Sequence, residues 1–155
     1  MNDRIKILNK LADEIKSLPV LVIGTHNQNI LEGSDDKYGL IFIDGDHSAE
    51  QVEKDIVNAW KALNPGGAIA INNCKPYTKE MQTMPRMQSQ WTGDTWRAVE
   101  GFKKEYPAIR TEDLGGKYGM IAIHKTKRKG KTPKIGFIDN ESTYEEMRAI
   151  WDKED

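Results

Sequence analysis

The sequence is poor in the features that mark several protein classes. It has one cysteine, Cys74, in 155 residues, so neither a disulfide framework nor a cysteine zinc site can form within the chain. No apolar run approaches the roughly 18 residues that a membrane-spanning helix needs. The first 16 residues carry charges throughout and lack the apolar segment of a secretion signal. We therefore expect a cytoplasmic protein with no membrane partner.

An excess of charge of either sign is also missing. The 23 basic and 24 acidic side chains give a formal net charge of −1. A chain without net positive charge has no general attraction to nucleic acid, so we expect no nucleic-acid partner. One segment, residues 125–134, holds six basic side chains among ten positions, which is typical of a solvated linker.

The length predicts one domain, because domains usually run to about 100–200 residues. We expect this domain over residues 1–124, followed by a basic linker and a short helix over residues 125–155. Ser142 and Glu145 have the spacing of a capping box, which predicts that the terminal helix starts there and runs to about Trp151.

Apolar runs that alternate with helical periodicity predict an α/β fold. Leu40 to Ile43 form an unbroken apolar run, which is typical of a strand covered on both faces, as in a parallel sheet. The expected elements are, in chain order, a helix at 4–17, strands at 20–23 and 38–43, a helix that starts after Ser48 and ends before the turn 64–67, a strand at 68–71, a helix at 94–105, and two strands within 109–124.

The unit from 38 to 71 has about the size of one βαβ crossover, so its two strands should be parallel. A helix followed by a hairpin then suggests an antiparallel edge that closes a mostly parallel sheet. The sequence therefore predicts a mostly parallel sheet with an antiparallel C-terminal hairpin.

Polar side chains follow both strands of this unit. Residues 44–47 read Asp-Gly-Asp-His, and Asn72 and Asn73 follow the next strand. Ligands of open α/β sheets bind beyond the carboxyl ends of the strands, so these groups are candidates for a site. Their oxygens suit a hard cation such as Mg²⁺, and an imidazole suits a general base. Turn formation and helix capping also explain the same residues, and both interpretations stay open at this point.

Residues 38–74, "YGLIFIDGDHSAEQVEKDIVNAWKALNPGGAIAINNC", resemble the fourth strand, fourth helix and fifth strand of class I S-adenosylmethionine-dependent methyltransferases. The phrases "FIDGDHS" and "LNPGGAI" carry the resemblance, which is closest to small-molecule and sugar O-methyltransferases. It continues more weakly through "WTGDTWRAVEGFKKEYP" and "GGKYGMIAIHK" and covers roughly residues 20–125. It implies a Rossmann-like three-layer sandwich whose last two strands are antiparallel.

The resemblance also implies a transferase that methylates a hydroxyl of a small molecule or sugar, with S-adenosylmethionine as cofactor. Asp44 and His47 match the catalytic aspartate and the histidine base, and Gly24, Asp44 and Gly45 are the expected cofactor contacts. In metal-dependent relatives the aspartate binds a divalent cation, together with two acidic residues after the fifth strand. The corresponding set here is Asp44, Asn72 and Asn73, in which amides replace two carboxylates and weaken a site for Mg²⁺.

The resemblance does not extend to the half of the family's fold that holds the cofactor. Neither the glycine-rich loop nor the acidic residue that binds the ribose is found in this sequence. Residues 20–24 match either the first strand or, at a better spacing, the third strand, in which case two strands are absent. We therefore expect a truncated Rossmann-like domain with a reduced strand number over residues 1–124. The alternative function is a catalytically degenerate fold that serves in binding or assembly. An uncovered sheet edge invites pairing, so we expect a homo-oligomer or a larger protein partner.

Overall fold

The computed structural model describes residues 3–16, 19–24, 27, 29–126 and 132–154. Within these ranges no helix is long and apolar enough to cross a membrane. The elements are α1 (Asp3–Ile15), β1 (Val20–Ile23), β2 (Tyr38–Ile43), α2 (Ala49–Ala62), β3 (Leu63–Ile71), the 3₁₀ helix η1 (Lys79–Gln82), α3 (Thr95–Glu105), β4 (Thr111–Gly115), β5 (Met120–His124) and α4 (Tyr144–Glu154).

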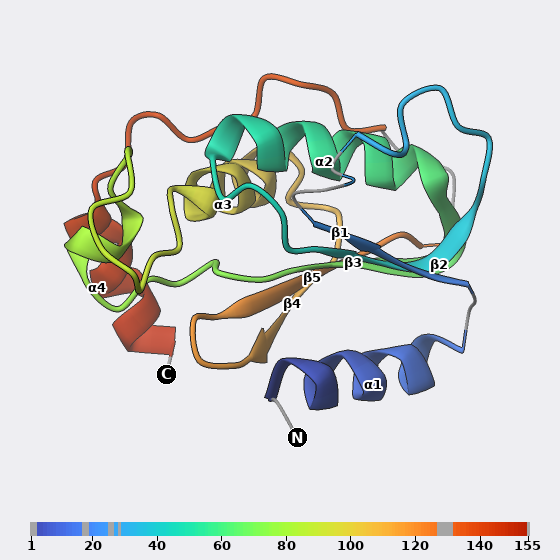
Figure 1. The fold of residues 1–155 in the computed structure, drawn as a ribbon, viewed down its shortest axis with the longest axis horizontal. Helices are drawn as coiled ribbons and strands as arrows, with labels where there is room; N and C mark the ends of the chain where they lie inside the picture. Colours follow the sequence, from blue (N-terminus) through green and yellow to red (C-terminus); the bar gives the residue numbers. More distant parts are fainter. Residues whose placement is uncertain (1–2, 17–18, 25–26, 28, 127–131, 155) are drawn as a thin grey trace.

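The strands form one sheet in the order β1-β2-β3-β5-β4. The pairs β1–β2 and β2–β3 are parallel, whereas β5 is antiparallel to both of its neighbours. Figure 1 shows α1 on one face of the sheet and α2 with α3 on the other. The predicted three-layer, mostly parallel α/β fold with an antiparallel C-terminal hairpin is therefore confirmed.

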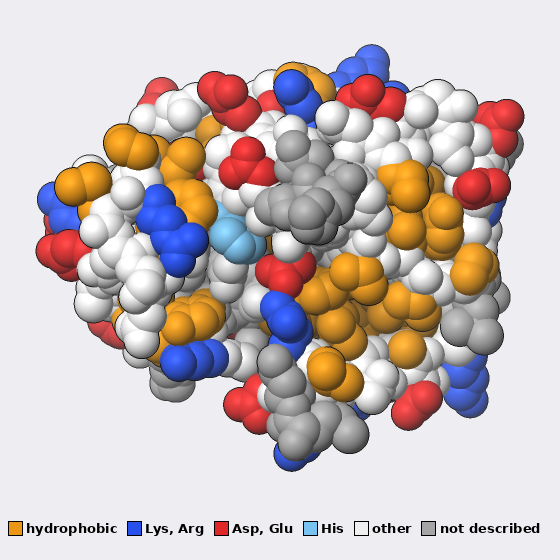
Figure 2. Space-filling view, in the orientation of Figure 1, with side chains coloured by type: hydrophobic (Ala, Val, Ile, Leu, Met, Phe, Trp, Pro, Cys, Tyr) orange, Lys and Arg blue, Asp and Glu red, His pale blue; other side chains and the backbone are white. Residues whose placement is uncertain are grey.

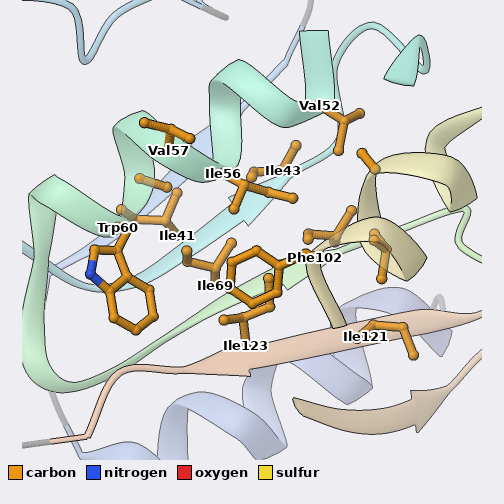
Figure 3. Close-up of a cluster of buried hydrophobic side chains, with 14 of the residues drawn as sticks. Ile41, Ile43, Val52, Ile56, Val57, Trp60, Ile69, Phe102, Ile121 and Ile123 are labelled. Atoms are coloured by element: carbon orange, nitrogen blue, oxygen red, sulfur yellow. The ribbon is translucent and has the colours of Figure 1, made fainter. Parts of the chain in front are cut away.

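Two apolar clusters hold the layers together, one on each face of the sheet. The larger cluster packs α2 and α3 against Ile41, Ile43 and Ile69 and is drawn in Figure 3. The smaller cluster packs Leu11 of α1 against Phe42 and the facing residues of β3 and β5. Both faces of β2 and β3 are thus covered, which explains the unbroken apolar run in the sequence.

The start of α2 follows the predicted capping, but its end differs from the prediction. The Ser48 hydroxyl accepts a hydrogen bond of 3.2 Å from the Gln51 backbone N–H, as an N-cap does. Residues 64–67, expected as a turn, belong to β3, which starts directly after the helix. The extra residues are absorbed by a shift in the β2–β3 register, where Tyr38 faces Leu63 but Leu40 faces Ala68.

The position of β1 decides whether this strand corresponds to the first or to the third strand of the family that the sequence resembles. β1 pairs directly with β2, which the resemblance equates with the fourth strand. In the doubly wound order 3-2-1-4-5-6 the neighbour of the fourth strand is the first. β1 therefore occupies the place of the first strand, and the third-strand interpretation, although it fitted the spacing better, is wrong.

β1 is an edge of the sheet that the described residues form. Its side chains toward α1 are largely uncovered, with Val20 44% and Val22 53% exposed. Figure 2 shows hydrophobic side chains gathered on this part of the surface, between β1 and α1. Such an edge is open to pairing with another strand. The homo-oligomer or larger partner expected from the sequence stays a prediction.

The terminal helix α4 packs against the α/β body. Trp151 is fully buried and meets Trp96 of α3 in an edge-to-face contact, with ring centroids 6.0 Å apart. Its N-cap is Thr143, whose hydroxyl accepts a 3.1 Å hydrogen bond from the Glu146 N–H. The predicted cap, Ser142, instead accepts from the Lys104 ammonium. The linker expected at 125–134 lies partly outside the described residues, so the division at residue 124 stays a prediction.

Asp55 of α2 is a buried carboxylate, and its environment gives a test of the packing. Its Oδ1 accepts a 2.9 Å hydrogen bond from the Gln51 side chain, while Oδ2 has no hydrogen-bond partner within the described part of the chain. Burial raises the pKa of this carboxyl from 3.8 to about 6. The folded state therefore binds more protons than the unfolded state between these two values.

Because of this difference, the contribution of Asp55 to the free energy of unfolding falls as the pH rises through that window. We expect Asp55→Asn to be more stable than the wild type near neutral pH by on the order of 2 kcal/mol, and to lose that advantage near the ordinary carboxyl pKa. Urea denaturation at several pH values measures this. The exposed Asp36→Asn is the control, and a pH-independent effect of Asp55→Asn would contradict the explanation.

Candidate functional site

The parallel pairing of β2 with β3 brings the predicted strand-end residues together. Ile43 and Ile71, the last residues of the two strands, face each other in the register. Asp44 follows the first strand, and Asn72 and Asn73 follow the second. These side chains and His47 line one cavity of about 680 Å³ at the carboxyl edge of the sheet.

The same cavity contains groups that the sequence did not single out. Arg4 reaches it from α1, Arg86 and Trp91 come from the segment between β3 and α3, and Tyr118 comes from the β4–β5 turn. A sequence signal for Arg4 did exist, because Arg4 precedes Leu8 by four residues and so continues the buried face of α1 by one turn.

Asp44 is held by two donors. The Arg4 guanidinium forms an ion pair with it, Nη1 to Oδ2 2.5 Å, and the Asn72 side chain donates a hydrogen bond to the same carboxylate. Burial nevertheless raises the pKa of Asp44 above its ordinary value, because the loss of solvation outweighs the opposing effects of Arg4 and His47. Asp44 thus lies in a poorly solvated environment next to a fixed cation.

His47 contacts an amide and an aromatic ring. The Asn73 side-chain nitrogen lies 2.9 Å from Nε2 and 3.3 Å from Nδ1, and the Trp91 ring stands edge-on at a centroid distance of 5.9 Å. Burial lowers the pKa of His47 below 6.5, and the Arg86 charge acts in the same direction. An amide donor also favours the neutral ring, because an imidazolium has no lone pair to accept the hydrogen bond. His47 is therefore predominantly neutral near pH 7, as a general base must be.

The turn after β3 aims Asn73 at this histidine. Asn73 is buried and has a left-handed backbone, φ 65°, which asparagine tolerates better than most residues. The next residue, Cys74, is buried with its thiol hydrogen-bonded to the Ile71 carbonyl, 3.2 Å. Burial strongly raises the pKa of Cys74, so its thiol stays protonated and inert.

The N-terminus of α3 holds the loop that carries His47. The Asp94 carboxylate accepts a 2.7 Å hydrogen bond from the Ala49 N–H at the start of α2. Asp94 stands at the N-cap position of α3, but its side chain makes no capping bond to its own helix. Gly93 packs so closely that a Cβ there would lie 2.0 Å from the His47 carbonyl oxygen. Only glycine fits at this contact, so α3 fixes the position of the site loop.

Arg86 and Trp91 belong to the long segment between β3 and α3. The Trp91 ring N–H donates a 2.7 Å hydrogen bond to the Thr83 carbonyl, which fixes the ring. The Arg86 guanidinium lies over this ring, 5.6 Å from its centroid, and donates a 2.8 Å hydrogen bond to the Gln88 carbonyl. The segment thus closes one side of the cavity with an aromatic wall and a positive charge.

Of the three residues expected to contact a cofactor, two line the cavity and one does not. Asp44 and Gly45 line the cavity, whereas Gly24 lies at the adjacent strand end and is not part of its lining. The Gly24 N–H donates a 2.7 Å hydrogen bond to the Asn27 side chain, and a Cβ at Gly24 would meet nothing closer than 3.9 Å. This position does not require glycine. A cofactor role for Gly24 stays a prediction.

The donor set Asp44, Asn72 and Asn73 does not fit Mg²⁺. It offers one carboxylate, which is already paired with Arg4, and the Asn73 amide is turned toward His47. Nor do the described residues hold any other group of three or more His, Cys, Asp or Glu side chains that could hold a metal ion. A hard cation would therefore have to displace a guanidinium from the only carboxylate of the set.

Comparison with known proteins points to methyltransferases. A family described as "Methyltransferase domain" matches residues 6–74. The fold is similar to a Staphylococcus aureus protein assigned as a caffeoyl-CoA O-methyltransferase, with a TM-score of 0.54, 16% identity, and coverage of 81% of this chain and 85% of that one. It is also similar to an O-methyltransferase from Bacillus cereus in complex with SAH, with a TM-score of 0.52, 14% identity, and coverage of 79% and 80%.

No curated protein matches the chain. The predicted resemblance to the class I methyltransferase-like family is confirmed by the family match and by the fold. The family match favours a methyltransferase-like function over the alternative of a degenerate binding or assembly module.

The environment of His47 predicts its titration. We expect His47 to titrate below 6.5, because burial disfavours the imidazolium. Asn73→Asp should raise its pKa, since a carboxylate beside the ring stabilises the protonated form. Proton NMR of the histidine ring protons measures both values. The internal control is His124, the last residue of β5, whose Nε2 lies 2.9 Å from Oε1 of Glu112. A His47 pKa at or above 6.5 in the wild type would contradict the prediction.

Proposed function

We propose that this chain, a class I methyltransferase-like protein by its family match and its fold, transfers a methyl group from S-adenosylmethionine to a hydroxyl of a small molecule or sugar. The observation that carries the proposal is a half-buried imidazole at the carboxyl edge of a parallel sheet, lining a polar cavity of about 680 Å³, with a pKa that burial lowers. Cavities of roughly 300–1,000 Å³ are typical of small-molecule sites.

The charges around the cavity suit S-adenosylmethionine, which carries a sulfonium, an ammonium and a carboxylate. Asp44 and Asp46 offer negative charge, and Arg4 and Arg86 offer positive charge. Gly45 is buried and has no side chain to keep a ligand away from the backbone. When bound, the cofactor would supply an activated methyl group. The SAH complex of the Bacillus cereus O-methyltransferase supports this choice of cofactor.

His47 would act as the general base. Methyl transfer to a hydroxyl needs alignment of donor and acceptor, and a group that takes the hydroxyl proton. In our proposal the acceptor hydroxyl replaces the Asn73 N–H at the unprotonated ring nitrogen and gives its proton to that nitrogen as the oxygen gains the methyl group. Asn73 is then a positioning residue, which holds the ring ready in the neutral form.

Trp91 and Arg86 would set which acceptors enter. The Trp91 ring stands edge-on against His47 and is fixed by its bond to Thr83, so a ring or sugar can pack beside the base. Arg86 adds a positive charge to the same wall. A small acceptor with a polar rim fits this lining better than a long apolar chain.

The role of His47 predicts a specific kinetic defect. We expect His47→Gln to lower kcat for methyl transfer by about 10²–10⁴-fold, because removal of a general base costs that much. The affinity for S-adenosylmethionine should change little, since the base acts on the acceptor. Transfer from labelled S-adenosylmethionine to a panel of small hydroxyl compounds gives kcat, and isothermal titration gives the affinity.

The matched control is His124→Gln, which removes the histidine paired with Glu112 and leaves the cavity intact. Equal activity of His47→Gln and wild type would exclude the base role. If the wild type neither bound the cofactor nor transferred a methyl group to any acceptor, the proposed function would be wrong.

A further inference from the structure

We infer that Arg4 fills the cation position of this site, so that the site works without a divalent metal ion and the guanidinium itself binds the acceptor oxygen. The assignment of that oxygen to a methyl acceptor rests on the proposed function. The inference that the site binds no metal ion does not rest on the proposed function, and it is tested separately below.

The first step is the state of the Asp44 carboxylate. A carboxylate with amide oxygens beside it, at the ends of parallel strands, is a donor set that hard cations use. Here the Arg4 Nη1 lies 2.5 Å from Asp44 Oδ2, and the Asn72 side chain donates to the same carboxylate. Donors from the protein thus occupy the group that a metal ion would need first.

The second step is the charge balance. Arg4 and Asp44 together carry no net charge, and the neighbouring Asn72 and Asn73 are neutral. Asp46, the second carboxylate of the cavity lining, is balanced in charge by Arg86. A divalent cation placed here would gain no net negative charge and would stand beside a guanidinium at close range, where repulsion in a poorly solvated site is strong. The same site with Arg4 in place is already neutral.

The third step is how firmly Arg4 is placed. It lies one turn before Ile7 and Leu8, which pack with Leu11 on the underside of the sheet. Its guanidinium carbon is 6.0 Å from the centroid of the buried Phe42 ring. The packing of α1 therefore places the Arg4 charge at the end of β2, in the position where a metal ion would otherwise supply the positive charge.

The fourth step is what Arg4 offers to a ligand. A guanidinium has five N–H donors in a planar fork, which matches paired oxygens such as those of a carboxylate or a diol. The Arg4 side chain is 40% exposed and lines both the main cavity and a neighbouring one of about 220 Å³. It can hold Asp44 and face an oxygen-rich acceptor at the same time.

Titration with Mn²⁺, a paramagnetic substitute for Mg²⁺, tests the inference without any substrate. Free Mn²⁺ is measured by its electron paramagnetic resonance signal. We expect the wild type to leave this signal unchanged. Arg4→Gln/Asn72→Asp, which removes the guanidinium and adds a second carboxylate, should bind Mn²⁺ at least about tenfold more tightly than the wild type.

The matched control is Lys6→Gln/Asn72→Asp. It removes an exposed positive charge from the same helix, keeps Arg4, and should stay unable to bind Mn²⁺. Thermal melts followed by circular dichroism confirm that each variant is folded. Should Arg4→Gln/Asn72→Asp fail to fold, the wild type compared with Asp44→Asn decides the question alone.

Binding of Mn²⁺ by the wild type that Asp44→Asn abolishes would overturn the inference. So would a folded Arg4→Gln/Asn72→Asp that binds no Mn²⁺, because Arg4 would then not be the group that excludes the metal ion. Methyl transfer unaffected by EDTA is expected as well. A lack of methyl transfer would refute the proposed function while leaving the Mn²⁺ result intact.

Discussion

The parallel pairing of β2 with β3 is the constraint on which the site depends. Parallel strands end at the same edge of a sheet, so the pair Ile43 and Ile71 puts Asp44 beside Asn72. Apolar side chains from both faces of the two strands pack into the two clusters, so the core holds this pair of strands in place. The polar groups at the strand ends are therefore positioned by the core and not by their own interactions.

The helices complete the site as a consequence of covering the sheet. α1 closes one face and its first turn brings Arg4 to Asp44. On the other face α3 begins where Asp94 binds the N-terminus of α2, and this contact fixes the loop of His47. The result is a half-buried carboxylate neutralised by a guanidinium, in the same cavity as a half-buried imidazole whose pKa is lowered. Asp44 and His47 are both poorly solvated, but Asp44 is paired with a cation, whereas His47 is neutral.

The sheet of the described residues has fewer strands than the doubly wound sheet that it resembles. β1 stands where the first strand belongs, and among the described strands nothing pairs with its outer edge. The exposed Val20 and Val22 lie at this edge, on the side of α1. The family match begins at residue 6 and includes β1 and most of α1. Asp44 and Gly45, which follow β2, line the cavity, whereas no described residue of β1 does.

The sequence by itself determined the elements, the parallel βαβ unit and the cluster at its strand ends, because periodicity and turn residues act locally. It could not decide between neighbouring caps of equal spacing, and Thr143 rather than Ser142 begins the last helix. Tertiary structure alone decided the partners of the site. Arg4 and Asp44 are 40 positions apart, and Trp91 meets His47 only because the segment after β3 folds back over the strand ends. Such contacts depend on how whole layers pack, and no local pattern of residues encodes that packing.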